Sequence, residues 1–261
     1  MENNYWIVDD CLIFKPEFND KLDEYYNVIN KYNKIMFSNY NDSLIAIETN
    51  NEFEQNYIDN YVENKFNQQI NLLNNINLSH LTFGDGFNKE INLLNNINLT
   101  HLTFEKEFNQ KIDLLNNINL TNLTFGYNFN QEINLLNNIN LTHLTFGTEF
   151  NQKIDIPLNV KSLTMNGCNN QYMIDNLHNN IEELIIFKTN LNLDNLPNSI
   201  KKLYVNYYDK ELNNLPNSIE YLELQNYKLK IKKIPKNLKT VKCDDKYKYV
   251  NDFKGCEVIT N

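Results

Sequence analysis

One five-residue block recurs at a fixed step of 21 residues through the middle of the chain. It starts with Phe-Asn and ends in Ile, as in FNQQI and FNKEI. The copies begin at Phe66, Phe87, Phe108, Phe129 and Phe150. A short period kept over many copies is typical of a solenoid, in which each unit buries its apolar face only against its neighbours.

A second block, NLTHLTF or a close variant, keeps a constant distance from the first. Its central leucine returns at intervals of 19 or 21 residues long after the first block has drifted. The nine positions are Leu81, Leu102, Leu123, Leu144, Leu163, Leu184, Leu203, Leu222 and Val241. The chain is therefore predicted to contain nine stacked units.

The spacing within one unit predicts how that unit folds. Leu99, Leu102 and Phe104 follow the L-x-x-L-x-L pattern of a leucine-rich repeat, whose last two apolar residues alternate along a short strand. Along the rest of the unit we expect apolar residues spaced three or four apart to point inward. These are Phe87, Ile91, Leu94 and Ile97. Because Asn and Pro interrupt the connecting segments, long helices are not expected there.

The predicted fold is a leucine-rich-repeat-like solenoid with parallel strands on its concave side. Irregular or single-turn connections form the convex side, and a mixed α/β cap precedes the repeats. We expect a cap or degenerate repeat region in residues 1–65, the solenoid in 66–250 and a C-terminal tail in 251–261. Terminal units of such arrays need a cap because their outer apolar face has no neighbour.

The repeat blocks resemble the FNIP repeat, named for a Phe-Asn-Ile-Pro-like core. Residues 66–157 match it closely, and residues 158–242 match more loosely through Leu-Pro-Asn-Ser-Ile at Leu196 and Leu215. The resemblance implies a leucine-rich-repeat-like fold without known enzymatic activity, found in social amoebae and in giant viruses of amoebae. It also implies that the partner is a host protein and that the location is the host cytoplasm. An intracellular protein is expected independently, because no secretion signal and no bilayer-spanning run is found in the sequence.

Some members of this family carry an F-box before the repeats, which implies recruitment of targets to a ubiquitin ligase. An F-box is helical and opens with Leu-Pro, whereas Pro16 is the only proline of residues 1–65. This segment instead predicts a strand at 6–14, a helix at 17–31 and apolar runs at 34–37 and 43–49. Phe53 begins what could be a worn copy of the repeat. We find no convincing F-box.

Composition excludes several functions. The chain carries 24 Lys but no Arg and has a net charge of −9, which argues against binding to nucleic-acid backbones. No apolar run is long enough to span a bilayer, and no secretion signal is evident. The six glycines form no phosphate-binding loop, and Cys168 with His178 is too little to predict a thiol nucleophile. We therefore expect no enzyme, no catalytic residues, no metal, no cofactor and no small-molecule substrate.

The repeat register predicts which strand residues face outward. In the early units these are His or Asn and Thr, whereas the later units vary in charge, size and aromaticity. Solenoids commonly bind through such rigidly spaced positions. The predicted protein-binding residues are Glu183, Lys202, Tyr204, Tyr221 and Glu223. The alternative is an ordinary solvated sheet face.

Two repeated polar positions carry more specific predictions. His80 and His101 should lie on adjacent strands, where mutual repulsion would lower the pKa of both. The Asn after each repeat Phe should form a ladder that satisfies backbone groups, so Asn109→Leu should cost about 1 to 3 kcal/mol. These positions are Asn88, Asn109, Asn130 and Asn151.

Nine lysines lie between Lys228 and Lys248. They could attract acidic partners or surfaces, protect the last strand from pairing with another molecule, or bind the acidic end of a second copy. The sequence leaves these alternatives and the oligomeric state open. The predicted function is a non-enzymatic scaffold that binds a protein on its concave face. The alternatives are a ubiquitin-ligase adaptor with a divergent N-terminal docking segment and an enzyme with an unrecognised site.

Overall fold

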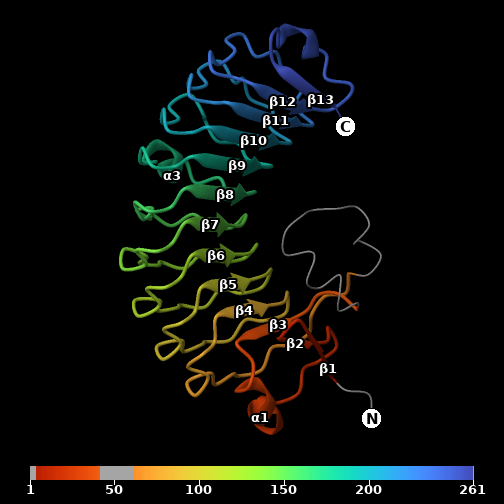
Figure 1. Cartoon of the computed structure of the whole chain (residues 1–261), viewed down its shortest axis with the longest axis vertical. Helices are drawn as coiled ribbons and strands as arrows, with labels where there is room; N and C mark the ends of the chain where they lie inside the picture. Colours follow the sequence, from red (N-terminus) through yellow and green to blue (C-terminus); the bar gives the residue numbers. More distant parts are fainter. Residues whose placement is uncertain (1–3, 42–60, 261) are drawn as a thin grey trace. The chain divides into compact units, whose positions relative to one another are not determined.

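The computed structural model describes residues 4–41 and 61–260, which fall into two compact units, Met1–Leu141 and Thr142–Asn261. Each unit is a stack of short strands joined by irregular loops (Figure 1). The apolar run expected at 43–49 and the worn repeat at Phe53 lie outside the described residues.

The strands of the first unit pair in chain order. They are β1 (Tyr5–Val8), β2 (Cys11–Phe14), β3 (Lys34–Phe37), β4 (His80–Phe83), β5 (His101–Phe104) and β6 (Asn122–Phe125). β1 and β2 are antiparallel, whereas each later pair is parallel. The prediction of a single strand at 6–14 is wrong. Asp9 and Asp10 adopt positive φ angles of 47° and 61°, and the chain turns there into a hairpin.

The helix predicted at 17–31 is also much shorter than expected. The structure has one 3-10 turn, η1 (Leu22–Tyr25), followed by one α-helical turn, α1 (Tyr26–Ile29). Neither begins with a side chain that caps its free N–H groups. Without such caps, and with Leu22 and Ile29 as the only buried side chains of these two turns, a longer helix is not stabilised here.

The strands of the second unit are all parallel. They are β7 (His143–Phe146), β8 (Ser162–Asn166), β9 (Glu183–Phe187), β10 (Lys202–Asn206), β11 (Tyr221–Gln225), β12 (Thr240–Cys243) and β13 (Glu257–Thr260). The short helices α3 (Gln171–Asp175) and η3 (Val250–Asp252) lie in the connections. The Asn170 side chain caps α3 by accepting a hydrogen bond from the Met173 N–H at 3.2 Å.

The predicted files of apolar side chains form the core of each unit. Leu81, Leu102 and Leu123 are paired in register on β4, β5 and β6, and each is at most 1% exposed. Within a repeat the strand Phe stacks on the block Phe, as Phe83 does on Phe87 with ring centroids 3.8 Å apart. The solenoid prediction is therefore confirmed.

Two of the residues predicted to point inward do not. Leu94 and Ile97 are 39% and 51% exposed, whereas Leu93 and Leu99 are buried. The cause is a pair of tight turns, in which the Asn96 N–H donates to the Leu93 carbonyl and the Leu99 N–H donates to the Asn96 carbonyl, each at 3.0 Å. The spacing of apolar residues is compatible with either Leu93 or Leu94 in the core, and the geometry of these turns decides which of them is buried.

Asparagine side chains connect successive repeats in two ladders. The predicted one is confirmed, since the Asn88 Oδ1 accepts from the Asn109 N–H at 3.0 Å and the Asn109 Oδ1 accepts from the Asn130 N–H at 2.9 Å. A second ladder, which the sequence did not predict, is fully buried. In it, the Asn117 Nδ2 donates to the carbonyls of Leu93 and Asn96 at 3.1 and 2.9 Å. The buried ladder consists of Asn75, Asn96, Asn117 and Asn138.

Candidate functional site

The five predicted binding residues lie together on three neighbouring strands of the second unit. Glu183 is on β9, Lys202 and Tyr204 are on β10, and Tyr221 and Glu223 are on β11. The register pairs Lys202 with both Glu183 and Tyr221, and Tyr204 with Glu223. Alternation along each strand sends all five side chains to the face opposite the core leucines. We call this set the strand-face patch.

Side-chain contacts join the members of the strand-face patch in two groups. The Lys202 Nζ forms an ion pair with the Glu183 carboxylate at 3.3 Å. The rings of Tyr204 and Tyr221 lie 5.3 Å apart at an angle of 43°, and the Tyr221 hydroxyl donates to Glu223 at 2.9 Å. The patch thus consists of one ion pair and, on the neighbouring strand positions, two tyrosines with the Glu223 carboxylate.

Glu223 is held firmly beneath this surface. It is only 7% exposed, and it accepts hydrogen bonds from the Tyr221 hydroxyl and from Gln225 Nε2 at 2.6 Å. Lys242 on β12 lies 3.6 Å from the same carboxylate. Burial and the hydrogen bond to Glu223 raise the pKa of Tyr221, so this hydroxyl stays a donor at neutral pH. Such partners fix the Tyr221 side chain in one orientation.

Aromatic side chains extend the patch beyond the predicted residues. Phe187 ends β9, and its ring meets that of Tyr207 edge to face at 5.6 Å. The Lys188 ammonium lies over both rings, at 5.1 and 5.2 Å from their centroids, which is within cation–π range. Lys188 and Tyr207 adopt positive φ angles of 48° and 52°, the conformation that Gly167 supplies in an earlier repeat.

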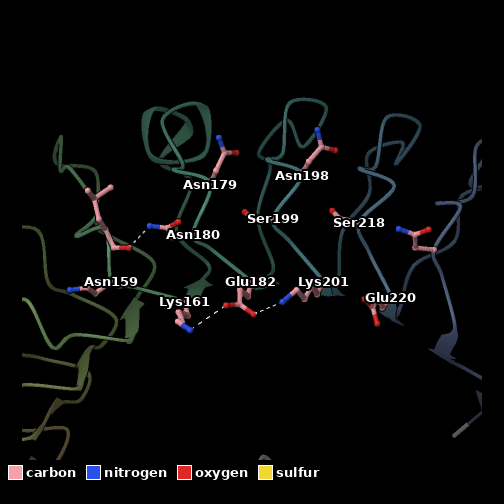
Figure 2. Close-up of a pocket in the computed structure, with 12 residues that line it drawn as sticks. Asn159, Lys161, Asn179, Asn180, Glu182, Asn198, Ser199, Lys201, Ser218 and Glu220 are labelled. Atoms are coloured by element: carbon pink, nitrogen blue, oxygen red, sulfur yellow. Dashed lines mark hydrogen bonds and ion pairs between the residues drawn. The ribbon is translucent and has the colours of Figure 1, made fainter.

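A row of alternating charges lies one residue before the outward-facing strand positions. The Glu182 carboxylate pairs with Lys161 at 3.3 Å and with Lys201 at 2.8 Å, and Lys239 contacts Glu220 at 2.5 Å. Hydrogen bonds from Lys201 and Lys161 lower the pKa of Glu182. We call this row the ion ladder. Figure 2 shows its first members side by side at the beginning of their strands.

A hollow of about 450 Å³ lies beside the ion ladder. Its other lining residues are mostly amides and hydroxyls, among them Asn179, Asn198 and Ser218 (Figure 2). The Asn180 Nδ2 donates to the Leu158 carbonyl at 2.9 Å and so fixes one wall to the preceding repeat. This hollow offers amide, hydroxyl and charged groups for polar contacts.

The sequence contained a signal for the residues that were missed. Lys161, Glu182, Lys201, Glu220 and Lys239 follow the same interval of 19 to 21 residues as the strand leucines. Lysine and glutamate alternate at this position, which lies two residues before each strand leucine. Phe187 and Tyr207 are harder to find, because they lie where the strands end and the loops differ in length.

The strand face of the first unit is uniform and polar. His80 pairs with His101, and Thr82 with Thr103, across β4 and β5. Each of these imidazoles meets the preceding hydroxyl through its Nδ1, at 2.8 Å from Ser79 and 2.9 Å from Thr100. This face has hydrogen-bonding groups but none of the aromatic area found in the second unit.

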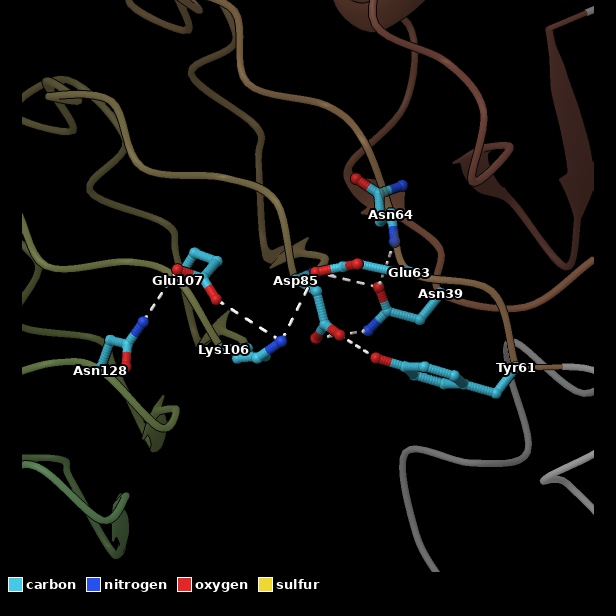
Figure 3. A network of polar contacts seen from close by, with 8 residues as sticks. All are labelled: Asn39, Tyr61, Glu63, Asn64, Asp85, Lys106, Glu107 and Asn128. Carbon is cyan, nitrogen blue, oxygen red and sulfur yellow. Dashed lines mark hydrogen bonds and ion pairs between the residues drawn. The ribbon is translucent and has the colours of Figure 1, made fainter.

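A buried carboxylate, Asp85, lies at the centre of a polar network in the first unit (Figure 3). It accepts hydrogen bonds from the Tyr61 hydroxyl and, at 3.2 Å, from Asn39 Nδ2. Lys106 forms ion pairs with Glu63 at 3.5 Å and Glu107 at 3.6 Å. Burial raises the pKa of Asp85. Because these partners link segments distant in sequence, we interpret the network as structural.

The lysine cluster near the C-terminus is partly neutralised. Four of its nine members form ion pairs, namely Lys230 with Asp252, Lys232 with Glu211, Lys239 with Glu220 and Lys242 with Glu223. The first three of these pairs are exposed, and exposed pairs contribute little to stability. Their presence reduces the charge available to attract an acidic partner or surface.

The other sequence candidates show no reactive arrangement. The Cys168 thiol is buried and lies 3.2 Å from the Phe150 carbonyl, while His178 Nε2 meets the Pro157 carbonyl at 2.9 Å. Among the described residues, no three His, Cys, Asp or Glu side chains are grouped to hold a metal ion. In the same part of the chain, no helix has the length and hydropathy to cross a membrane.

These features define a class of protein. Short parallel strands in register, leucine files beneath them and asparagine ladders between turns are those of a leucine-rich-repeat-like solenoid. The chain is similar to CroV588, a protein from a giant virus that is described as a novel circular leucine-rich-repeat protein. The two share 31% identity with a TM-score of 0.60, over 94% of this chain and 42% of that one. The chain thus spans less than half the length of CroV588.

The repeat itself is also identified. The sequence model described as FNIP Repeat matches residues 187–227, which confirms the resemblance predicted from the repeat blocks. An internalin, InlF from Listeria monocytogenes, matches with 16% identity and a TM-score of 0.49, over 96% of this chain and 86% of that one. A comparison with curated proteins gives no match.

Proposed function

We propose that the protein is a non-enzymatic scaffold that binds another protein through the strand-face patch of its second unit. The observation that supports this most is the change in the outward-facing residues along the repeats. His and Thr occupy these positions on β4 and β5, whereas Tyr204 and Tyr221 occupy them on β10 and β11. Tyrosines that are large, oriented and partly exposed are the usual anchors of protein interfaces.

The surroundings of the patch favour a protein partner over a small molecule. Phe187, Lys188 and Tyr207 widen the aromatic area, and the ion ladder borders it with paired charges. An apolar centre with a polar rim is the common arrangement of protein interfaces. Small-molecule sites are instead concave and mostly apolar, unlike the polar hollow beside the ladder. A host-cell protein is the partner that the similarity to a giant-virus protein suggests.

Site-specific photo-crosslinking tests the proposal. A photo-reactive phenylalanine replaces Lys202, which is exposed beside Tyr204, in the full chain. A matched protein carries the same group in place of Thr103 on the strand face of the first unit. We expect a discrete adduct in host-cell extract from position 202, and its loss when Tyr204→Ala and Tyr221→Ala are added. Equal adducts from both positions, or an adduct that survives the tyrosine substitutions, would refute the proposal.

A further inference from the structure

Both tyrosines of the strand-face patch lie in a field in which negative charge predominates. Burial, followed by the charge of Glu183, raises the pKa of Tyr204, and the charge of Glu223 acts in the same direction. The lysine that opposes them, Lys202, has a smaller effect than Glu183. For Tyr221, burial and the hydrogen bond to Glu223 raise the pKa, and the charge of that carboxylate adds to them. A field that opposes the loss of a proton from tyrosine also attracts a cation.

The outward-facing positions of β8 to β13 carry more negative than positive charge. They hold three glutamates and two lysines, namely Glu183, Glu223, Glu257, Lys202 and Lys242. Lys202 is already paired with Glu183 at 3.3 Å. Lys242 likewise faces Glu223 at 3.6 Å. Because both lysines are neutralised within the chain and one glutamate is in excess, a basic partner complements this face better than an acidic one.

The surface beside the patch already binds one cation through aromatic rings. Lys188 places its ammonium over Phe187 and Tyr207, at 5.1 and 5.2 Å from their centroids. In the described part of the chain, no lysine ammonium lies over Tyr204 or Tyr221. Both of these rings are partly exposed, and a tyrosine face attracts cations within about 6 Å of its centroid. The two rings can therefore receive a cation that the partner supplies.

We propose, on the basis of the scaffold function above, that the strand-face patch binds an arginine side chain of its partner, stacked on Tyr204 and hydrogen-bonded to Glu183. Glu183 on β9 pairs with Lys202 on β10, two residues before Tyr204, so Glu183 and Tyr204 are diagonal neighbours. Diagonal neighbours are within reach of aromatic and long side chains. A guanidinium is planar and can lie on a ring while its N–H groups bind a carboxylate.

This ligand chemistry means that the partner differs from the chain itself. The chain contains 24 Lys and no Arg, so a second copy has only ammonium groups to offer. An ammonium is a compact, strongly hydrated charge without a planar face. Lys202 illustrates the difference, because it pairs with Glu183 without lying over Tyr204. The proposed ligand therefore belongs to an arginine-bearing protein.

Lys202 occupies the Glu183 carboxylate when no partner is bound. Its side chain is 56% exposed and that of Glu183 is 26% exposed, so their ion pair is accessible to water and contributes little. The Ser162 hydroxyl donates to the other Glu183 oxygen at 3.0 Å and keeps the carboxylate in place. A guanidinium, which offers two parallel N–H groups, can therefore displace the ammonium into water. Removal of Lys202 should strengthen the binding of arginine.

NMR titration of the full chain with the peptide acetyl-Gly-Arg-Gly-amide tests the proposal. We expect saturable shifts of the Tyr204 and Tyr221 ring signals, whereas Tyr127, which is exposed on the first unit, should not respond. A peptide with citrulline keeps the shape of arginine but lacks its charge, and should bind about 10-fold more weakly. Peptides with lysine or glutamate should also bind more weakly. Equal or tighter binding of any of these three peptides, or an equal response of Tyr127, overturns the proposal.

Substitutions separate the patch from general attraction to an acidic chain. Glu183→Gln should raise the Kd of the arginine peptide about 5-fold or more, because the charge-assisted hydrogen bond is lost. Glu149→Gln is the matched control, since it removes the same charge from an exposed side chain of the second unit and should leave the Kd unchanged. Lys202→Gln should lower the Kd. Circular dichroism checks the fold of each variant, and Tyr204→Leu replaces Glu183→Gln if the latter is poorly folded. Equal losses in the Glu183 and Glu149 variants overturn the proposal.

Competition in the crosslinking experiment distinguishes this proposal from the scaffold function on which it rests. The adduct formed from position 202 in host-cell extract should decrease when the arginine peptide is added, and should persist when the glutamate peptide is added. An adduct that forms but resists the arginine peptide overturns the assignment of arginine and leaves the scaffold function intact. Absence of any adduct overturns both.

Discussion

The imidazole rings of His80 and His101 stack on neighbouring strands, with centroids 4.2 Å apart and planes within 8° of parallel. Burial, followed by the charges of His101 and Lys34, lowers the pKa of His80 to about 4. The predicted depression is confirmed for His80, but burial contributes more than the mutual repulsion that the sequence suggested. His80 therefore favours the folded state in its neutral form.

Stability should fall in acid because of this histidine. The folded pKa of His80 lies below the unfolded value of about 6.5, so its contribution is complete above that pH and is lost as the pH falls towards 4. Since the ring is only half-buried, we expect about 1 to 2 kcal/mol. NMR titration should show the low pKa, and His101→Asn should raise it part of the way. A pKa of His80 at or above about 6.5 in the wild type would contradict this explanation.

Glu105 should have the opposite pH dependence. Burial and the neighbouring Asp85 raise its pKa to about 7, so the folded chain retains a proton that the unfolded chain releases near pH 4.5. Stability therefore falls as the pH rises from about 4.5 to 7. Glu105→Gln should stabilise the protein by about 1 to 2 kcal/mol at pH 8 and have little effect at pH 4.

Urea denaturation at the two pH values measures this difference. Glu132→Gln is the matched control, because Glu132 is exposed in the next repeat. It should change stability by less than about 0.5 kcal/mol at either pH. Equal effects of the two substitutions on stability at pH 8 would show that the surroundings of Glu105 do not disfavour its charged form.

Asn117→Leu should destabilise the first unit strongly. The substitution removes the donors that satisfy the buried carbonyls of Leu93 and Asn96, at a cost of about 2 to 4 kcal/mol. Asn109→Leu acts on the half-buried ladder and should cost nearer to 1 kcal/mol, the lower end of the range expected from sequence. Urea denaturation measures both. If Asn109→Leu has the larger effect, the assignment of the main ladder to Asn117 is wrong.

Cysteine labelling should follow burial. Burial raises the pKa of Cys168 to about 11 and that of Cys11 to about 11, whereas Cys256 is only partly buried. Because the thiolate is the reactive form, iodoacetamide at neutral pH should modify Cys256 first and Cys168 very slowly. Mass spectrometry of timed samples gives the order. Rapid labelling of Cys168 in the folded protein would revive the possibility of a reactive thiol.

Much of the architecture was predictable because a repeat places the same environment at the same interval. Leu81, Leu102 and Leu123 could be aligned by counting, and the five residues of the strand-face patch follow from the same register. The repeat interval predicts nothing about segments that lie outside the repeats. The hairpin at Asp9 and Asp10 lies outside the repeats and depends on left-handed turn residues within an apolar run.

The sequence by itself determined that successive units must stack, since none can bury its leucine and phenylalanine side chains alone. It also determined which strand residues share a face, because alternation along a strand is a property of the backbone. Only the tertiary structure decided that Asn96 rather than Leu94 enters the core and that Ile97 is exposed. The reason is that a buried carboxamide is stable only where carbonyls of the neighbouring turn accept both of its hydrogens, and those partners come from another repeat.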